Sequence, residues 1–158
     1  MRWATSWSCF GRAHSCCGCC SQWTCPTPRP SQESRPMSSS SDSATLAVLV
    51  RQDLGMSAGK IAAQTAHAAV ACSLKARKEA SALFARWRSE HGRIVVLGVE
   101  DLEALEVHLE DAQAHRLVHH AVSDAGRTEV APGTVTVLGI GPAPSSVLEV
   151  LVGRLEAL

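Results

Sequence analysis

Aromatic side chains are scarce in this chain of 158 residues, with 4% aromatic residues and no tyrosine. Proteins that hold single-stranded nucleic acid without sequence preference stack bases on aromatic rings, so this mode of binding is disfavoured. No apolar run reaches the ~18 residues of a membrane-spanning helix, and we expect no transmembrane segment. The formal net charge is zero, and 46% of the residues are hydrophobic, which is enough for a buried core. The composition also excludes collagen, a coiled coil and a wholly disordered chain.

Residues 1–45 differ in composition from the remainder. They hold six of the seven cysteines and three of the four tryptophans, followed by prolines and serines, without helical or strand periodicity. We therefore predict a disordered leader over residues 1–45 and a folded domain over residues 46–158. The leader is poor in acidic residues and contains Arg and Ser, as organelle transit peptides do, and it lacks the apolar segment of a secretory signal. Two alternatives remain open: metal binding by Cys16–Cys20, for which no second ligand pair follows, and a true start at Met37.

Hydrophobic periodicity in the folded part predicts alternating strands and helices. The predicted strands are residues 46–50, 94–97, 116–122 and 134–140, and the predicted helices are residues 61–78, 81–90, 101–114 and 145–158, with a turn at residues 141–144. Helices between the early strands imply parallel crossovers, whereas the loop between the last two strands permits an antiparallel pair. We therefore expect an α/β fold, with a mixed four-stranded sheet and helices on both faces in a three-layer α/β/α arrangement.

Charge is distributed unevenly within this domain. Residues 60–93 hold seven basic side chains and two acidic ones, and residues 100–111 hold six acidic side chains and no basic one. A basic flank suits the phosphates of a nucleic acid, where Lys and Arg release condensed counterions. Lys75 and Arg86 on this flank are candidate substrate-binding residues, and two solvated helix faces are the alternative.

A glycine-containing segment, GMSAGKIAAQTAHAA, occupies residues 55–69. It fails as a P-loop, because its glycine spacing is one residue short and Ile61 replaces the residue that binds Mg²⁺, so nucleotide hydrolysis is rejected. Lys60, Gln64 and His67 fall within an arc of ~60° on one helix face, and Lys60 lies in the first turn, where backbone N–H groups favour anions. The opposite positions are mostly alanine, and we expect them to pack on the sheet. A packed or hydrogen-bonded histidine is the alternative for His67.

Two further motifs belong to the last two strands. Residues 123–134, SDAGRTEVAPGT, connect them, and Asp124 lies directly after a strand, where ligand sites of α/β sheets are commonly built. A simple Asp-Gly turn is the alternative. In residues 134–142, TVTVLGIGP, alternation places Thr134 and Thr136 on one side and the intervening valines on the other. Threonine is also simply a good strand former.

Together these motifs resemble the archaeal/eukaryotic-type peptidyl-tRNA hydrolases, a second family unrelated in fold to the common bacterial enzyme. The matching blocks, in order, are Gly59–Gln64, His67–Ala69, Asp124–Thr128, Ala131–Thr134 and Gly139–Pro142. The resemblance covers residues 46–158 and does not extend to the leader.

The resemblance implies hydrolysis of the ester that joins the C-terminal carboxyl of a peptide to the ribose of tRNA, which releases free tRNA and peptide. It also implies a mixed four-stranded sheet between helix layers, a homodimer in the usual case, and no metal or other cofactor. The functional residues of the family correspond here to Lys60, Gln64, His67, Asp124, Thr128 and Thr136.

Ester hydrolysis requires a positioned water, a base and a donor for the carbonyl oxygen. A covalent triad is disfavoured, because the chain has no Gly-x-Ser-x-Gly motif and no base aligned beside Cys72. We therefore predict direct attack by water. Asp124, with His67 or Thr128, orients and deprotonates the water. Lys60 stabilises the oxyanion or grips a terminal phosphate.

The predicted site therefore has two parts, with no metal ligand among them. The catalytic candidates are Lys60, His67, Asp124 and Thr128, and the substrate-binding candidates are Gln64, Arg127, Thr136, Lys75 and Arg86. A non-catalytic RNA-binding or adaptor protein on the same scaffold is the alternative function. A single cysteine in the folded part suits a reducing interior. We expect a cytoplasmic protein, or a mitochondrial or plastid one if residues 1–45 act as a transit peptide.

Overall fold

A computed structural model of the chain describes residues 42–124 and 130–158, which belong to one compact unit, Ser38–Leu158. Most of the predicted leader lies outside the described residues, as do Arg127 and Thr128. No helix within the described residues is both long enough and apolar enough to cross a membrane.

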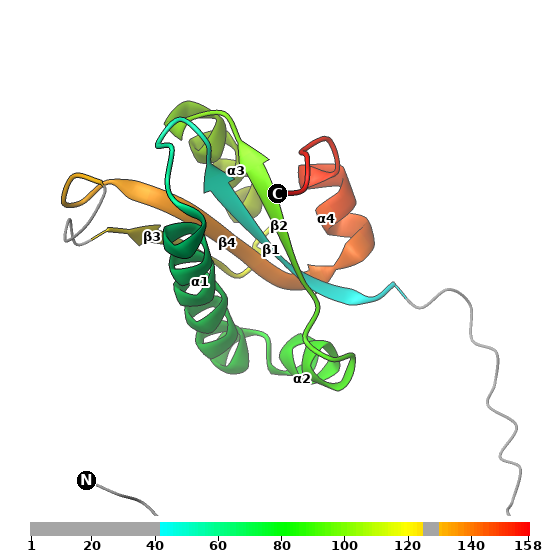
Figure 1. The fold of residues 1–158 in the computed structure, drawn as a ribbon. Coiled ribbons are helices and arrows are strands. Elements are labelled where there is room, and N and C mark those ends of the chain that lie inside the picture. The colour runs from blue at the N-terminus through cyan, green and yellow to red at the C-terminus, as the bar shows by residue number, and fades with distance from the viewer. Residues whose placement is uncertain (1–41, 125–129) are drawn as a thin grey trace, which may run out of the picture. The chain divides into compact units, whose positions relative to one another are not determined.

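A four-stranded sheet, in the order β2-β1-β4-β3, forms the middle layer of the fold (Figure 1). Its strands are β1 (Ala44–Arg51), β2 (Ile94–Val99), β3 (His119–Ser123) and β4 (Val135–Pro144). β1 pairs with β2 in parallel, and β4 pairs antiparallel with both β1 and β3. The mixed sheet is therefore confirmed, with the helical crossover giving the parallel pair and the helix-free loop giving the antiparallel pair.

Helices cover both faces of this sheet. They are α1 (Ala58–Glu79) and α2 (Ser81–Ser89) on one face, and α3 (Leu102–Ala114) and α4 (Ser145–Val152) on the other. Strand alternation in β1 supplies both interfaces, since Leu46 and Val48 pack towards α1 and α2 while Ala47 and Leu49 pack towards α3 and α4. The predicted helices on both faces are confirmed.

The starts of β1 and β3 differ from the prediction by two or three residues. β1 begins at Ala44, because this residue pairs with Pro144 of β4 and its N–H donates to the Glu90 carboxylate at 2.7 Å. β3 begins at His119 rather than at residue 116, because α3 ends in a turn in which Arg116 has a positive φ of 54°. A residue in that left-handed conformation cannot continue a strand.

The end of the chain also differs from the prediction. The expected turn at residues 141–144 is wrong, since β4 continues to Pro144. A register shift between Thr45 and Ala47 of β1 lies opposite this proline-containing segment, and proline is found within sheets at such bulges. The last helix ends at Val152 rather than at residue 158. The chain then follows β2, where the N–H of Leu158 donates to the carbonyl of Val96 at 3.1 Å.

The face of α1 that packs on the sheet only partly matches the one predicted. Its buried residues are Gln64, Ala68, Ala69, Cys72 and Ala76. Of the alanines opposite Lys60 on the helix, Ala69 packs as expected, whereas Ala62 and Ala66 are exposed. Alanine occurs on both sides of α1, so composition alone does not select the packing face. The close approach is made at Gly139 of β4, where an added Cβ would lie 2.7 Å from the sulfur of Cys72.

We expect Gly139→Ala to lower the free energy of unfolding by about 1–3 kcal/mol, as overpacking of a core does. The new Cβ would lie 2.7 Å from Cys72 Sγ and 3.4 Å from the backbone oxygen of Ala68. Urea unfolding followed by circular dichroism measures the loss. In a Cys72→Ala background, which removes the sulfur, the same change should cost less. An equal loss in both backgrounds would contradict this contact.

Candidate active site

A buried ion pair joins the first turn of α1 to the residue that follows β3. Lys60 Nζ donates to Asp124 Oδ2, and the two side chains are 11% and 7% exposed. The residues lie 64 positions apart in the sequence, so the fold alone brings them together. Breaking a buried ion pair by removing one partner typically costs about 3–5 kcal/mol, so we expect each side chain to influence the stability that the other provides.

The backbone on each side of this pair is fixed by hydrogen bonds. Ser57 caps the N-terminus of α1, and its side chain accepts from the N–H of Lys60 at 3.4 Å. The N–H of Asp124 donates to the carbonyl of Thr134 at 2.9 Å, and the carbonyl of Asp124 accepts from the N–H of Gly133 at 2.8 Å. These two bonds hold the backbone of Asp124 beside residues 133 and 134, whereas the Asp-Gly turn that was the alternative runs into residues 125–126, which lie outside the described residues.

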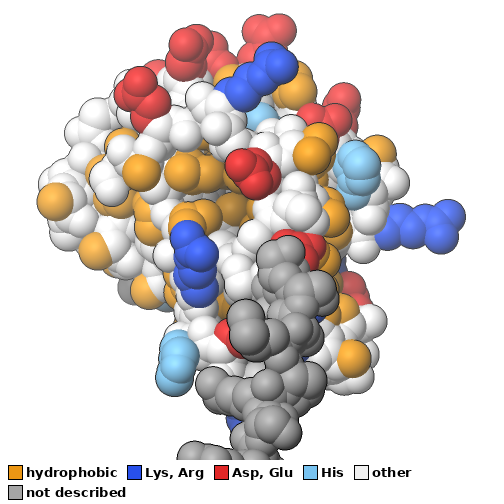
Figure 2. All heavy atoms as spheres, turned by 90° about the vertical axis from the view of Figure 1, so that its right-hand side faces the viewer, with side chains coloured by type: hydrophobic (Ala, Val, Ile, Leu, Met, Phe, Trp, Pro, Cys, Tyr) orange, Lys and Arg blue, Asp and Glu red, His pale blue; other side chains and the backbone are white. Residues whose placement is uncertain are grey.

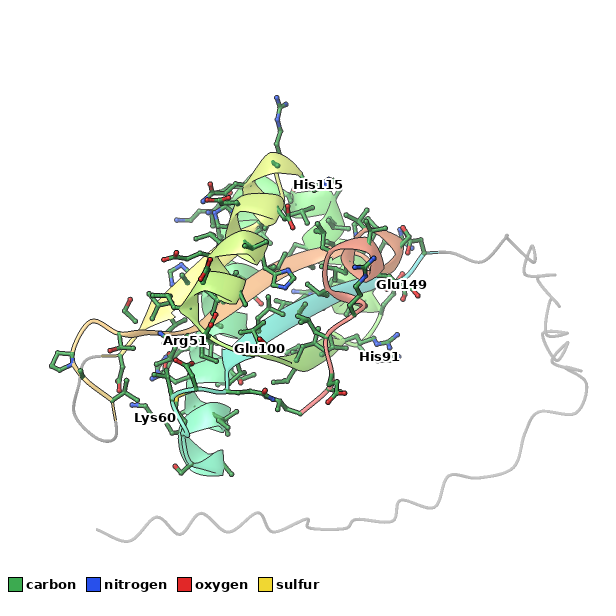
Figure 3. The ribbon with its side chains drawn as sticks, turned by 90° about the horizontal axis from the view of Figure 1, so that it is seen from above. Arg51, Lys60, His91, Glu100, His115 and Glu149 are labelled. Atoms are coloured by element: carbon green, nitrogen blue, oxygen red, sulfur yellow. The ribbon has the colours of Figure 1, made fainter. Side chains whose placement is uncertain are left out.

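Arg51 stabilises the same end of the sheet and is not among the predicted site residues. Arg51 ends β1, its side chain is 9% exposed, and its guanidinium donates to the Asp53 carboxylate at 2.6 and 3.1 Å. It also donates to the carbonyl of Val135 at 2.9 Å, which ties β1 to the start of β4. Figure 3 shows Arg51 and Lys60 at the same end of the sheet. The hydrogen bond from Arg51 holds the pKa of Asp53 below its ordinary value of 3.8. In the sequence, Arg51 could have been recognised as a cation at the end of an apolar strand, with the carboxylate of Asp53 two residues later.

A groove of about 460 Å³ lies between α1 and β3. One end of it is lined by three of the predicted site residues, Gln64, His67 and Asp124. Gln64 is 6% exposed, and its Oε1 has no hydrogen-bond partner within the described residues. Because an unsatisfied buried acceptor costs about 1–3 kcal/mol, a donor on a bound ligand is its natural partner. His67 is exposed and lines the same groove.

Thr136 is fully buried at an irregularity between β3 and β4. Val122 pairs with Val137 and Ser123 pairs with Val135, so Thr136 is the extra residue of a β-bulge. The predicted alternation is wrong here, because Val135 packs towards α3 and α4 while Val137 packs towards α1 and α2. The Thr136 hydroxyl donates to the carbonyl of Val122 at 3.2 Å, and so bonds to the strand that leads into Asp124.

The two cationic candidates lie away from the ion pair. Lys75 Nζ donates to the carbonyl of His119 at 3.3 Å, and at ~1.5 Å of rise per residue Lys75 lies about 22 Å along α1 from Lys60. Arg86 belongs to α2, beyond the C-terminal end of α1 (Figure 1), where it donates to Glu90 at 2.9 Å and to the carbonyl of Asp42. The structure therefore brings together Lys60, Gln64, His67 and Asp124 but not Lys75 or Arg86.

Two predicted site residues and the single described cysteine do not contribute to this observed cluster. Thr128 and Arg127 lie outside the described residues, so both stay predictions.

Burial raises the pKa of the Cys72 thiol to about 12, which keeps it protonated at neutral pH and unsuited to nucleophilic attack. Over residues 42–124 and 130–158, no group of three or more His, Cys, Asp or Glu side chains could hold a metal ion.

A second hollow, of about 440 Å³, lies between β2 and α4 on the opposite side of the sheet. Figure 2 shows this side, with hydrophobic side chains visible in its middle and acidic side chains along its upper rim. Its lining includes Val95, Leu97 and Leu148 but none of the predicted site residues. Gln64, His67 and Asp124 therefore line the groove beside α1 and not this hollow.

The fold and this groove define an α/β protein that carries a buried lysine–carboxylate pair at one end of a mixed sheet. Residues 44–158, beginning at the first residue of β1, match the sequence model described as Peptidyl-tRNA hydrolase PTH2. The chain belongs to this family, and the resemblance inferred from its motifs is confirmed.

Curated relatives agree with this assignment. The Peptidyl-tRNA hydrolase of Thermoplasma volcanium is 39% identical over 113 residues, which cover 72% of this chain and 97% of the relative. The Peptidyl-tRNA hydrolase of Metallosphaera sedula is 42% identical over 115 residues, covering 72% of this chain and 98% of that protein. The Probable peptidyl-tRNA hydrolase 2 of Schizosaccharomyces pombe is 41% identical over 111 residues, covering 70% of this chain and 54% of that protein.

Proposed function

We propose that this chain is a peptidyl-tRNA hydrolase that cleaves the ester between a nascent peptide and the 3′-terminal ribose of tRNA. The products are free tRNA and peptide, so the reaction recycles tRNA. The observation that carries the proposal is the buried Lys60–Asp124 pair beside the groove, in a chain of the PTH2 family.

The reaction proceeds by direct attack of water on the ester carbonyl. The Asp124 carboxylate takes a proton from the water as the new C–O bond forms. Lys60, held against the same carboxylate, donates to the carbonyl oxygen as negative charge develops there. The bond to the ribose oxygen then breaks, and the proton passes to that oxygen, which leaves a carboxylic acid and a ribose hydroxyl.

The other candidates hold substrate or water around this centre. The Oε1 of Gln64, which has no hydrogen-bond partner among the residues that the structure describes, supports a role in accepting a hydrogen bond from the substrate or the attacking water. His67 lines the groove and orients the water with Asp124. Thr136 is fully buried and bonded to the carbonyl of Val122, so it is assigned to holding the strand before Asp124 rather than to substrate binding. Arg127 and Thr128 follow Asp124 within the family motif, and we assign Arg127 to substrate binding and Thr128 to the water.

Release of a labelled peptide from peptidyl-tRNA by the purified protein tests the function. We expect many turnovers per enzyme molecule, with intact tRNA as the second product. A non-catalytic RNA-binding protein on the same scaffold would bind the tRNA and release no peptide, and that result would contradict the proposal.

Substrate binding is expected to weaken as the salt concentration rises, because Lys75 and neighbouring cations on α1 and α2 meet tRNA phosphates. Each such contact contributes about 0.7–0.9 to the slope of log affinity against log salt. Lys75→Gln should therefore reduce the slope by about one, measured by titration of deacylated tRNA. Arg154→Gln, which changes an exposed cation on the side of α4, is the matched control and should leave the slope unchanged. A flat response to salt would mean that these helix faces are merely solvated.

We further propose a homodimer, as the family resemblance implies, that acts in the cytoplasm. If residues 1–45 serve as a transit peptide, the site of action is instead a mitochondrion or plastid, and a fluorescent reporter fused to this segment distinguishes the two. The acid-poor composition of residues 1–45, with Arg and Ser, supports the transit-peptide assignment.

A further inference from the structure

The groove beside α1 is bordered by a strand edge. β3 ends the sheet of the described residues, with β4 as its neighbour on one side. On the side of β3 that faces away from β4, the groove runs along α1 from Gln64 to Leu74. At ~1.5 Å of rise per residue this stretch is about 15 Å long. An extended peptide rises about 3.3 Å per residue, so the groove accommodates about four residues.

The main chain of β3 presents hydrogen-bonding groups to this edge. In an antiparallel pair, alternate residues bond to the partner strand and the others face away. The carbonyl of Val118 accepts from the N–H of Gly141 at 2.7 Å, so residues 118, 120 and 122 face β4. The main-chain groups of Ala121 and Ser123 therefore face outwards. A contact of Lys75 agrees with this alternation. Its Nζ donates at 3.3 Å to the carbonyl of His119, which faces outwards like those of Ala121 and Ser123.

The lining of the groove suits a peptide rather than phosphates. Val70 and Leu74 are 59% and 51% exposed and lie one helical turn apart, so they form an apolar patch, and Val122 lines the groove from β3. Among the described residues that line the groove there is no lysine or arginine. A nucleic-acid backbone needs cations along its path, whereas an extended peptide needs main-chain partners and apolar subsites.

From these observations we propose that the peptide moiety of the substrate binds in this groove as an added strand, parallel to β3. The inference rests on the proposed hydrolase function. The scissile ester lies beside Asp124, at the C-terminal end of β3, so the C-terminus of the peptide lies there too. Its N-terminus then points towards His119, and the peptide runs in the same direction as β3. The unpartnered Oε1 of Gln64 accepts a hydrogen bond near the ester, and Val70 and Leu74 contact side chains further along.

Recognition of this kind depends on the peptide main chain and tolerates many side chains. It also depends on peptide length, because a single esterified residue ends before it reaches the part of the groove formed by Leu74. We expect kcat/KM to rise with each residue added up to about four, with about twofold to tenfold for each main-chain hydrogen bond gained.

The test compares substrates on one tRNA with the full-length protein. They are an N-acetyl-aminoacyl-tRNA and peptidyl-tRNAs of two to five residues, each with a counterpart in which one internal amide is N-methylated. N-methylation removes a main-chain donor and is expected to lower kcat/KM by about twofold to tenfold at the bonded amides. Leu74→Asp should flatten the dependence on length, whereas Val107→Asp, at an apolar residue of α3 that is 53% exposed, should leave the dependence intact.

Four other results would each contradict a different part of the proposal. Equal kcat/KM for all lengths, with the N-acetyl substrate hydrolysed, would overturn the strand proposal and leave the hydrolase function standing. Weaker binding of deacylated tRNA by Leu74→Asp, with no effect of N-methylation, would assign the groove to the tRNA terminus. A changed oligomeric state with unchanged kinetics would assign it to a second copy of the chain. Absence of hydrolysis of every substrate would overturn the function itself.

Discussion

Lys60→Ala is expected to lower kcat for peptidyl-tRNA hydrolysis by at least about 100-fold, the effect of removing one donor to a developing oxyanion. Lys60 lies in the first turn of α1 and is ion-paired with Asp124, so its ammonium is fixed beside the predicted base. The measurement is steady-state hydrolysis with kcat and KM determined separately. A rise in KM with unchanged kcat would instead assign Lys60 to a phosphate of the terminal nucleotide, and near-normal turnover would remove it from the mechanism.

Lys60→Ala also leaves the Asp124 carboxylate buried beside a neutral residue, so a loss of stability must be separated from a loss of chemistry. Circular dichroism and tRNA affinity provide this control, since a folded variant keeps both. Lys60→Arg is the conservative counterpart. It retains the charge and should keep more activity than Lys60→Ala, although a planar guanidinium does not reproduce the position of an ammonium.

Asp124→Asn is expected to reduce kcat by about 10²–10⁴-fold, because an amide cannot take the proton of the attacking water. The substitution is close to isosteric, and the main-chain hydrogen bonds of Asp124 to Thr134 and Gly133 do not depend on the side chain. The affinity for tRNA, measured by titration with deacylated tRNA, should therefore be retained. An equal loss of affinity and activity would make Asp124 a structural residue of the turn.

Much of the fold follows from local sequence signals. The apolar run within β1 and the alanine-rich segment of α1 each predict one element, and the helix between β1 and β2 predicts their parallel pairing. The family motifs also predict that Lys60 and Asp124 belong to one site, although no local rule places a helix start beside a residue 64 positions away.

The features that the sequence did not reveal depend on tertiary contacts. The bulge at Thr136 breaks strand alternation, and only the pairing of β3 with β4 shows it. The packing face of α1 is selected by the space above Gly139, since alanine occurs on both sides of the helix. From the sequence, Arg51 is only the polar end of a strand, and its hydrogen bonds to Asp53 and to the carbonyl of Val135 depend on the fold. Each feature therefore requires the three-dimensional arrangement of distant segments.

Whether Lys60 and Asp124 act as one catalytic unit is tested most directly by a double-mutant cycle. Single-turnover rates would be compared for the wild type, Lys60→Ala, Asp124→Asn and the double variant, all shown to be folded. Groups that act as a unit are non-additive, so the double variant should react within about threefold of the slower single variant. Multiplication of the two separate losses would show that the groups act independently, and the buried ion pair would then not be the catalytic centre.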